Sequence, residues 1–180
     1  MCLKTVLSIA ALATLLGSVA CKNNTTAPPA STPASNQPVA SKTPGPLPDR
    51  AFRALLAIKD APTKLRAGQK ETVVVRVKNA SDVFWWARGG ETNDANSNRF
   101  YIAVGDRWLQ QDGKLVTEMD GRIGIPKDLR PGEEVEVPLT ISAPTTPGNY
   151  TLEIDLVQEQ VSWFHDKGSP TAKAEVTVVR

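Results

Sequence analysis

A Pro-Gly turn at residues 147–148 leads into alternating apolar and polar residues, and this segment constrains the fold more than any other. Proline presets its own φ and glycine tolerates positive φ, so the dipeptide favours a tight turn. The apolar positions are Tyr150, Leu152, Ile154 and Leu156, and the polar positions between them are Thr151, Glu153 and Asp155. A period of two over seven residues predicts a strand that buries its apolar face and leaves its carboxylates on a wet face.

Other segments from residue 49 onward also favour strands. Val73, Val75 and Val77 share one face of segment 72–79, which is typical of a β-strand. Further strand-like segments, separated by Gly and Pro turns, are 99–109, 115–126, 134–141 and 172–179. Segment 51–60 fits either an edge strand or a short helix. About seven to nine short strands without a convincing helix predict an all-β fold, an immunoglobulin-like two-sheet β-sandwich over residues 49–180.

Three positions predict local details of these strands. Gly105 interrupts an apolar segment and indicates a β-bulge. Asp112-Gly113 suits a type I′ hairpin turn. Pro138 cannot donate a hydrogen bond to a neighbouring strand, so we expect its strand to lie at a sheet edge or to carry a bulge.

The N-terminus has the pattern of an export signal. Lys4 precedes an 11-residue, mostly apolar run over residues 6–16. The run is shorter than the roughly 20 residues that a membrane-spanning helix needs, and it has the dimensions of a secretory h-region. We therefore expect a signal peptide at residues 1–20. Ser18-Val19-Ala20 fits a general signal peptidase site, and a second cleavage chemistry competes with it.

The second cleavage chemistry involves Cys21, the residue directly after the expected signal peptide. Ala20-Cys21 resembles the end of a bacterial lipoprotein signal, in which the cysteine is acylated and becomes the mature N-terminus. The resemblance implies lipidation of Cys21 and a membrane anchor, and Lys22 after the cysteine implies sorting to the outer membrane. Each buried acyl CH₂ contributes about 0.8 kcal/mol, so two or three chains anchor a protein stably. The expected location is the cell membrane or the outer membrane, with the rest of the chain periplasmic or surface-facing.

A disordered linker is expected at residues 21–48. Of the 27 residues after Cys21, seven are proline and none is aromatic. Such a segment cannot bury enough apolar area to offset its chain entropy. Pro-rich chains favour the polyproline II conformation at ~3.1 Å per residue, so the linker reaches up to about 80 Å. We interpret it as a spacer that holds the sandwich away from a membrane.

Charge and cysteine content exclude several classes of protein. Three lysines and no acidic residue precede residue 49, which leaves 18 basic and 19 acidic residues in the remainder. A nucleic-acid-binding domain would show a clustered basic face, and no such run exists. Cys2 leaves with the signal peptide, so Cys21 is the only cysteine of the mature chain. The sandwich therefore contains no disulfide.

The order of these parts resembles a bacterial Ig-like or fibronectin-III-like accessory domain of glycan-handling proteins. The likeness rests on these motifs: Asn79-x-Ser81 with Trp85 or Trp86, Arg107-Trp108-Leu109 with Asp112-Gly113, Leu129-x-Pro131-Gly132-Glu133, Ala143-Pro144, Pro147-Gly148-x-Tyr150, and Asp155-Leu156-Val157 with Trp163-Phe164. Domains of this class share no catalytic residues, so the resemblance implies a binding or structural module.

Tyr150 has two interpretations. Gly148-x-Tyr150 resembles the corner at which immunoglobulin-type sandwiches begin a central strand, where the tyrosine hydroxyl bonds to upstream backbone. Alternatively, Tyr150 is an aromatic residue that favours the start of a strand and has no further role.

Aromatic residues near strand ends are the candidate ligand-binding residues, namely Trp85, Trp86, Trp163 and Phe164. A row of tryptophans on a sandwich can stack on sugar rings, whereas a sandwich also needs a large aromatic residue in its core. Neighbouring residues of a strand point to opposite faces, so Trp85 and Trp86 cannot both be core residues.

The loop before the strand at 99–109 partly matches a calcium-binding loop. Asp94, Asn96 and Asn98 occupy the first three ligand positions. Arg99 and Gly105 stand where glycine and a bidentate glutamate are required, so a polar loop without metal is the favoured interpretation.

Two further groups of polar residues are weak candidates for chemistry. Glu153 and Asp155 are expected about 6–7 Å apart on one strand face, a separation that suits a glycosidase pair. Carboxylates on a wet strand face are ordinary, however. His165 is the only histidine, and the sandwich contains no thiol and no G-x-S-x-G motif to accompany it. Zinc would need more ligands than this domain has, so His165 is interpreted as a surface residue.

These observations predict a lipid-anchored envelope protein whose sandwich is a non-catalytic module for protein or glycan. No catalytic residue, cofactor or metal is expected. The expected partners are the membrane, through the lipid at Cys21, and an envelope protein or polysaccharide, but not nucleic acid. The alternative is a protease inhibitor or small envelope enzyme that uses the loops around 85–98 and 159–170.

Overall fold

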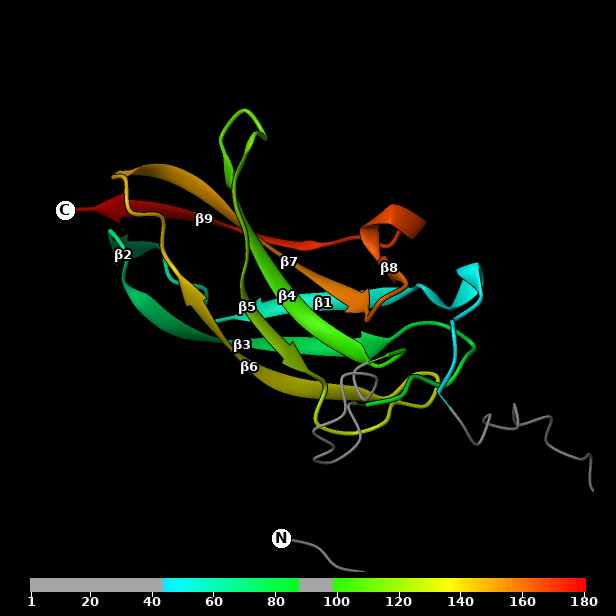
Figure 1. Cartoon of the computed structure of the whole chain (residues 1–180). Helices are drawn as coiled ribbons and strands as arrows, with labels where there is room; N and C mark the ends of the chain where they lie inside the picture. The colour runs from blue at the N-terminus through cyan, green and yellow to red at the C-terminus, as the bar shows by residue number, and fades with distance from the viewer. Residues whose placement is uncertain (1–43, 88–98) are drawn as a thin grey trace, which may run out of the picture. The chain divides into compact units, whose positions relative to one another are not determined.

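The computed structural model describes residues 44–87 and 99–180, which form two β-sheets and two short 3₁₀ helices (Figure 1). The first sheet has the order β1-β3-β6 and contains β1 (Ala54–Lys59), β3 (Lys70–Asn79) and β6 (Glu134–Ser142). The second has the order β2-β9-β7-β4-β5 and contains β2 (Lys64–Arg66), β9 (Ala172–Val179), β7 (Gly148–Gln158), β4 (Ile102–Gln110) and β5 (Leu115–Gly124). β8 (Ser162–Trp163) pairs with β7, and the helices are η1 (Asp49–Ala51) and η2 (His165–Lys167).

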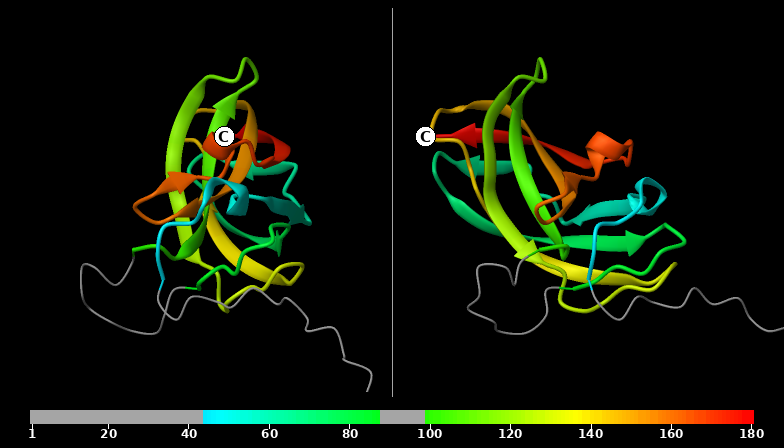
Figure 2. Two further views of the ribbon diagram at one scale, coloured as in Figure 1. Left: turned by 90° about the vertical axis from the view of Figure 1, so that its right-hand side faces the viewer. Right: turned by 45° about the vertical axis from the view of Figure 1, so that its right-hand side comes forward.

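The two sheets form an immunoglobulin-like β-sandwich, which confirms the predicted fold class. All strand pairs are antiparallel except β2 with β9. Figure 2 shows the sheets as two layers, with β4, β5, β7 and β9 in one and β1, β3 and β6 in the other. Cys21, the linker up to residue 43 and the loop with Asp94, Asn96 and Asn98 lie outside the described residues.

The core lies between the sheets and contains the apolar face that the alternation predicts. Tyr150, Leu152, Ile154 and Leu156 of β7 are all buried. The three valines expected to share a face of β3 are also buried, as is Trp108 of β4. Full burial of an aliphatic side chain contributes roughly 1.5–3 kcal/mol. These residues therefore supply a large part of the free energy that joins the two sheets.

The expectation of a wet second face on β7 is wrong. Glu153 and Asp155 are each only 3 % exposed, and Val157 beside them is also buried. β7 lies in the middle of its sheet, between β4 and β9. The tip formed by β8 and η2 pairs with the end of β7, and its Trp163 and His165 side chains lie over Gly105 and Asp155 on this face. The period of two marks the core face correctly, but it does not reveal the cover on the other face.

Tyr150 adopts the corner arrangement predicted for it. Its hydroxyl donates a hydrogen bond of 2.9 Å to the backbone carbonyl of Thr146. This bond ties the beginning of β7 to the turn that precedes it, and a bond of this kind stabilises a fold by about 1 kcal/mol.

Three local predictions are confirmed and one is wrong. Pro138 lies in β6, an edge strand of its sheet, and the register between β4 and β5 shifts next to Gly105. Of the two alternatives for segment 51–60, the edge strand is confirmed as β1, and the helix η1 ends at Ala51, where the segment begins. The β4–β5 turn is not type I′, because Gly113 (φ 84°) has positive φ but Gln111 and Asp112 do not. Gly113 donates to the Gln110 carbonyl, so a type I turn precedes a glycine bulge.

The chain approaches the sandwich at the end of β7. The buried side chain of Gln158 accepts a hydrogen bond of 2.8 Å from the backbone N–H of Leu47. Its amide donates to the carbonyls of Gly45 (2.8 Å) and Phe100 (2.9 Å). Gln158 therefore attaches the last residues before the sandwich to the end of the molecule where β4 begins.

Candidate functional site

Two of the four predicted ligand-binding aromatics belong to the core. Trp85 and Phe164 are fully buried, with ring centroids 5.1 Å apart in an edge-to-face arrangement. Phe52 packs against Phe164 at 4.9 Å, and Trp85 donates its indole N–H to the carbonyl of Ala51 at 3.1 Å. The expectation that Trp85 and Phe164 contact a ligand is therefore wrong, because water cannot reach either ring.

The other two aromatics, Trp86 and Trp163, are half-buried. Trp86 packs edge-to-face on Phe84 at 4.9 Å. Trp163 carries the guanidinium of Arg122 over its ring, 5.3 Å from the centroid. Each pair of adjacent aromatics thus contributes one residue to the core and one to the surface, as alternation requires. Trp86 and Trp163 are the members that a ligand can reach.

Trp163 occupies a space that exists because residue 105 is glycine. Gly105 pairs with Asp155 of β7 on one side and with Arg122 of β5 on the other. A Cβ atom at Gly105 would lie 2.8 Å from Cη2 and 3.2 Å from Cζ3 of the Trp163 ring. The ring therefore rests against bare backbone, and this position brings it beneath Arg122.

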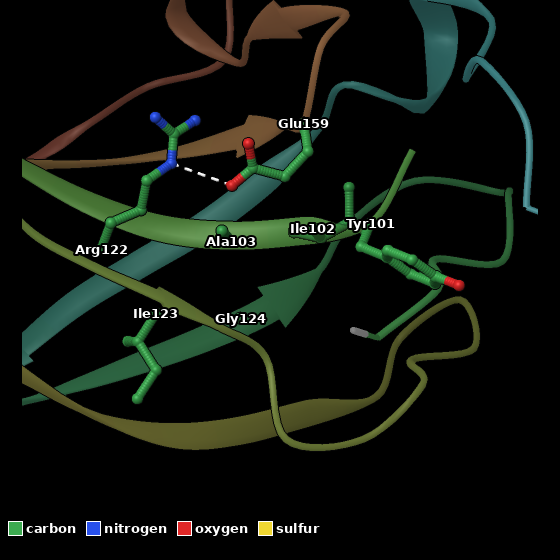
Figure 3. Close-up of a pocket in the computed structure, with 7 residues that line it drawn as sticks. All are labelled: Tyr101, Ile102, Ala103, Arg122, Ile123, Gly124 and Glu159. Carbon is green, nitrogen blue, oxygen red and sulfur yellow. Dashed lines mark hydrogen bonds and ion pairs between the residues drawn. The ribbon is translucent and has the colours of Figure 1, made fainter. Parts of the chain in front are cut away.

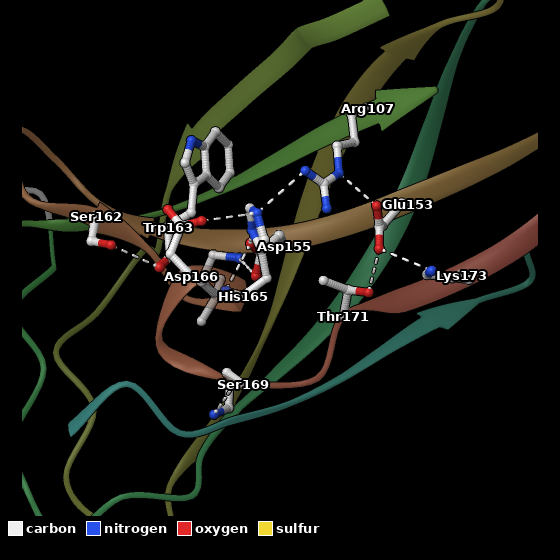
Figure 4. Close-up of polar contacts among 12 residues, drawn as sticks. Arg107, Glu153, Asp155, Ser162, Trp163, His165, Asp166, Ser169, Thr171 and Lys173 are labelled. Carbon is white, nitrogen blue, oxygen red and sulfur yellow. Dashed lines mark hydrogen bonds and ion pairs between the residues drawn. The ribbon is translucent and has the colours of Figure 1, made fainter. Parts of the chain in front are cut away.

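The covered face of β7 carries a network of charged residues (Figure 4). Arg107 donates to Oε2 of Glu153 at 2.5 Å. The other oxygen of Glu153 accepts from the Thr171 hydroxyl at 2.6 Å and lies 3.3 Å from Nζ of Lys173. Burial opposes ionisation of Glu153, but the hydrogen bonds from Arg107 and Thr171 outweigh it and hold the pKa of Glu153 below its ordinary value. Glu153 is therefore an ionised carboxylate whose oxygens are both bonded.

Asp155 forms the second half of this network with His165. Its Oδ2 accepts from the backbone N–H of His165 at 3.2 Å and lies 2.6 Å from the ring Nδ1. Its Oδ1 accepts from the backbone N–H of Leu156 at 2.7 Å. Burial raises the pKa of Asp155, and the hydrogen bonds from His165 and Leu156 offset only part of that effect. His165 is thus a partner of a buried carboxylate, so its interpretation as a simple surface residue is wrong.

Asp106 is the most strongly perturbed carboxyl group. It is 2 % exposed, and burial raises its pKa to about 6 despite a hydrogen bond from the backbone N–H of Gly121. That bond is 2.6 Å long and reaches Oδ1, while Oδ2 has no hydrogen-bond partner among the described residues. A Cβ atom at Gly121 would collide with the carbonyl oxygen of Thr140. Asp106 therefore attaches to β5 at a point where that strand passes close to β6.

A shallow cleft of about 240 Å³ opens where β4 begins and β5 ends (Figure 3). Its lining residues are Tyr101, Ile102, Ala103, Arg122, Ile123, Gly124 and Glu159. Arg122 donates to Glu159 Oε1 at 2.9 Å, and these two side chains remain 34 % and 23 % exposed. Tyr101 is half-buried and also lines the cleft, and its ring points away from the ion pair (Figure 3). The cleft thus combines an aromatic surface with an accessible donor and an accessible acceptor.

No sequence motif indicates the three side chains that characterise this cleft, which are those of Tyr101, Arg122 and Glu159. Arg122 and Glu159 are 37 residues apart, and no motif joins them. They meet because β4 pairs with both β5 and β7, which brings the end of one hairpin beside the end of another strand. Trp163, which the sequence did predict, lies behind Arg122 and does not line the cleft.

Residues 44–87 and 99–180 contain neither a candidate metal site nor a membrane-spanning helix. Within these ranges no cluster of three or more His, Cys, Asp or Glu side chains could hold a metal ion. The described residues also include no helix long and apolar enough to cross a membrane.

No protein-family description matches this sequence, and no curated protein sequence matches it. Among solved structures, a CARDB domain from Pyrococcus furiosus is 20 % identical, with a TM-score of 0.41, over 70 % of this chain and 94 % of that domain. A β-glucosidase from Listeria innocua in complex with glucose is 18 % identical, with a TM-score of 0.42, over 71 % of this chain. A sporulation control protein from Bacillus subtilis is 15 % identical, with a TM-score of 0.38, also over 71 % of this chain. The chain spans 16 % of the β-glucosidase and 49 % of the sporulation protein, and the likeness concerns the fold only.

Proposed function

We propose that this protein is a non-catalytic glycan-binding module of the bacterial cell envelope, anchored through a lipid on Cys21. The observation that carries the proposal is the cleft between β4, β5 and β7. Tyr101 offers an aromatic surface there, and the Arg122–Glu159 ion pair offers polar groups that solvent reaches. Sugars are bound by this combination, because a sugar ring has an apolar face for packing and hydroxyl groups for hydrogen bonds.

The size of the cleft supports contact with part of a polymer. Its volume of about 240 Å³ is below the roughly 300–1,000 Å³ of pockets that enclose a drug-sized ligand. A single sugar residue can enter it while the rest of a chain continues over the exposed residues of β5, including Ile123. The module would therefore bind a polysaccharide along its surface.

The state of the carboxylates supports a role without catalysis. A glycosidase needs two carboxyl groups that reach the substrate from opposite sides. Both oxygens of Glu153 and both oxygens of Asp155 are instead engaged by neighbouring groups of the protein. The tip that carries Trp163 and His165 covers them. An envelope enzyme that used this pair would first have to remove that cover.

Cosedimentation with insoluble polysaccharides tests the binding function. The full-length protein is mixed with cellulose, insoluble β-1,3-glucan and chitin, and the bound fraction is measured for each. We expect binding to at least one polymer and a loss of up to about tenfold in affinity for Tyr101→Ala, because a stacked aromatic ring contributes about 0.5–1.5 kcal/mol. Gln111→Ala is the matched control, since Gln111 is exposed on the hairpin at the far end of β4.

The same experiment distinguishes competing sites. Trp86→Ala removes the other half-buried tryptophan that the sequence predicts as a ligand contact. If Trp86→Ala abolishes binding and Tyr101→Ala does not, the binding face lies around Phe84 and Trp86, and the cleft has no role. If the wild-type protein binds none of a broad range of polysaccharides, the proposed function is wrong.

Membrane anchoring is tested separately by fractionation. Cys21→Ser removes the only thiol that a lipoprotein-type signal could acylate. We expect the wild-type protein in the membrane fraction and the variant in the soluble fraction, because acyl chains supply the membrane affinity. A variant that remains in the membrane fraction would show that Cys21 does not anchor the protein.

A further inference from the structure

The cleft has no net charge among its described lining residues. Among the described lining residues, Arg122 and Glu159 carry opposite charges and form an ion pair of 2.9 Å. The other lining residues are Tyr101, Ile102, Ala103, Ile123 and Gly124, which are uncharged. A site for an anionic polymer would present unbalanced positive charge, as basic patches do on proteins that bind polyanions. The charge balance therefore favours a neutral ligand.

The ion pair also matches the hydrogen-bonding chemistry of a sugar. A guanidinium group only donates hydrogen bonds, and an ionised carboxylate only accepts them. A hydroxyl group does both, so two neighbouring hydroxyls of one sugar ring can accept from Arg122 and donate to Glu159. Hydrogen bonds to charged groups are shorter and roughly twice as strong as those between neutral groups. A carboxylate of an acidic sugar would instead face repulsion from Glu159.

Both members of the ion pair are held in place from behind. Arg122 lies over the Trp163 ring, and that ring rests against the backbone at Gly105. The backbone N–H of Glu159 donates to the carbonyl of Tyr101 at 2.9 Å, and the carbonyl of Glu159 accepts from Phe100 at 3.0 Å. The same contacts fix the Tyr101 segment beside the ion pair. Groups positioned before binding lose little freedom when the ligand arrives.

From these contacts we infer that the cleft recognises one residue of an uncharged polysaccharide. The Arg122–Glu159 pair bridges two hydroxyl groups of this residue, and the Tyr101 ring, which points away from the pair (Figure 3), packs on the neighbouring part of the polymer. This inference rests on the proposed glycan-binding function and specifies its ligand class. Trp163 acts as a positioning residue, because it holds Arg122 and does not itself line the cleft.

The test compares neutral and anionic polymers at two ionic strengths. Affinities of the full-length protein for a soluble β-glucan, a galactomannan, alginate and polygalacturonate are measured by titration calorimetry at about 0.05 M and about 0.5 M NaCl. Screening by salt weakens attraction between a protein and a polyanion but leaves neutral binding almost unchanged. We expect a neutral polymer to bind with an affinity that changes less than about twofold between the two conditions.

Two variants test the role of the ion pair. Glu159→Gln keeps the shape of the side chain but removes the charged acceptor, and we expect a loss of about tenfold in affinity for the neutral polymer. Asp112→Asn makes the same chemical change at an exposed position of the distant β4–β5 turn and should bind as the wild type does. Thermal unfolding of both variants verifies that they fold.

The outcomes separate the two proposals. Binding of alginate or polygalacturonate in preference to the neutral polymers, with a steep salt dependence, overturns the neutral-ligand inference but keeps the glycan-binding function. Unchanged affinity of folded Glu159→Gln for the neutral polymer also overturns the inference. Failure of the wild-type protein to bind any of these polymers overturns both.

Discussion

Gly105 of β4 and Trp163 of β8 occupy one position on the outer face of the sheet, because the indole ring fills the space where a side chain of residue 105 would stand. The same row across the sheet contains Asp155 on one side of Gly105 and Arg122 on the other. Trp163 is thereby placed between the buried carboxylate network and the cleft. One aromatic residue, Trp163, therefore lies beside both the carboxylate network and the cleft.

Gly105→Ala should destabilise the protein and displace Trp163. Overpacking a well-filled site costs about 1–3 kcal/mol. Gly105 has no positive φ, so alanine introduces no backbone strain, and any loss is due to the clash with the ring. Urea unfolding monitored by circular dichroism measures the change.

A double mutant isolates the steric cause. In a Trp163→Ala background the ring is absent, so Gly105→Ala should have no destabilising effect. Gly45→Ala is the control in the wild-type background, because no atom of the described residues lies within 4 Å of a Cβ atom at that position. Equal losses from Gly105→Ala with and without Trp163 would show that the ring does not occupy this space.

Asp106→Asn should stabilise the protein above pH about 6. The pKa of Asp106 is about 6 in the folded protein against 3.8 ordinarily, so the folded state binds this proton more tightly than the unfolded chain. Its contribution to stability is fully present below the ordinary pKa and is lost as the pH rises through about 6. The ionised, buried group then destabilises the fold by something on the order of 2–3 kcal/mol. Asparagine keeps an acceptor for the N–H of Gly121 without the charge.

The test is how the difference in free energy of unfolding between Asp106→Asn and the wild type changes with pH. We expect the stabilisation in chemical denaturation at pH 8 to disappear by about pH 4, where Asp106 is protonated in the wild type. Asp112→Asn, at an exposed turn, should change stability by less than about 0.5 kcal/mol at both values. A stabilisation by Asp106→Asn that is the same at both pH values would show that charge is not its cause.

Tyr150→Phe should cost about 1 kcal/mol. The change removes the hydrogen bond to the Thr146 carbonyl but keeps the buried ring, which packs edge-to-face near Trp108. Tyr101→Phe is the matched control, because Tyr101 is only half-buried and lies in the cleft. Thermal unfolding should show a lower midpoint for Tyr150→Phe only. Equal midpoints for wild type and Tyr150→Phe would mean that the corner bond does not stabilise the fold.

Arg107→Ala should destabilise the protein by about 1–3 kcal/mol, because it leaves the buried Glu153 without its closest cation. Arg50→Ala breaks an ion pair with Asp82 in which both side chains are 67 % exposed. Exposed pairs contribute about 0–1 kcal/mol, so this control should change little. Urea unfolding of the two variants compares a covered ion pair with an exposed one. Similar small losses from both would contradict the burial of the network.

The buried faces of the sandwich could be predicted from the sequence because they depend on local periodicity. The valines of β3, the apolar face of β7 and the Tyr150 corner all follow from residue spacing and turn chemistry. The second face of β7 could not be predicted in this way. Its burial depends on the tip at residues 162–168 folding back, and this is set by Phe164 entering the core beside Trp85.

The candidate site depends on contacts between distant segments to an even greater degree. Alternation indicates that one of Trp85 and Trp86 is exposed, but it does not say which. Arg122 and Glu159 are ordinary surface residues in the sequence, and strand order makes them neighbours. Alternation places Asp155 on the solvent-facing side of its strand, whereas its burial depends on contact with His165, ten residues later.

The four tryptophans provide the most direct test of the cleft as the binding site. Trp85 and Trp108 are fully buried, while Trp86 and Trp163 are half-buried at different places. Indole N–H signals in a ¹H–¹⁵N spectrum of the full-length protein report on all four during titration with a polysaccharide that binds. We predict that the Trp163 signal moves, because Arg122 lies over its ring and contacts the ligand, and that the Trp85 and Trp108 signals stay in place. Movement of the Trp86 signal without Trp163, or no movement at saturating ligand, would contradict the account.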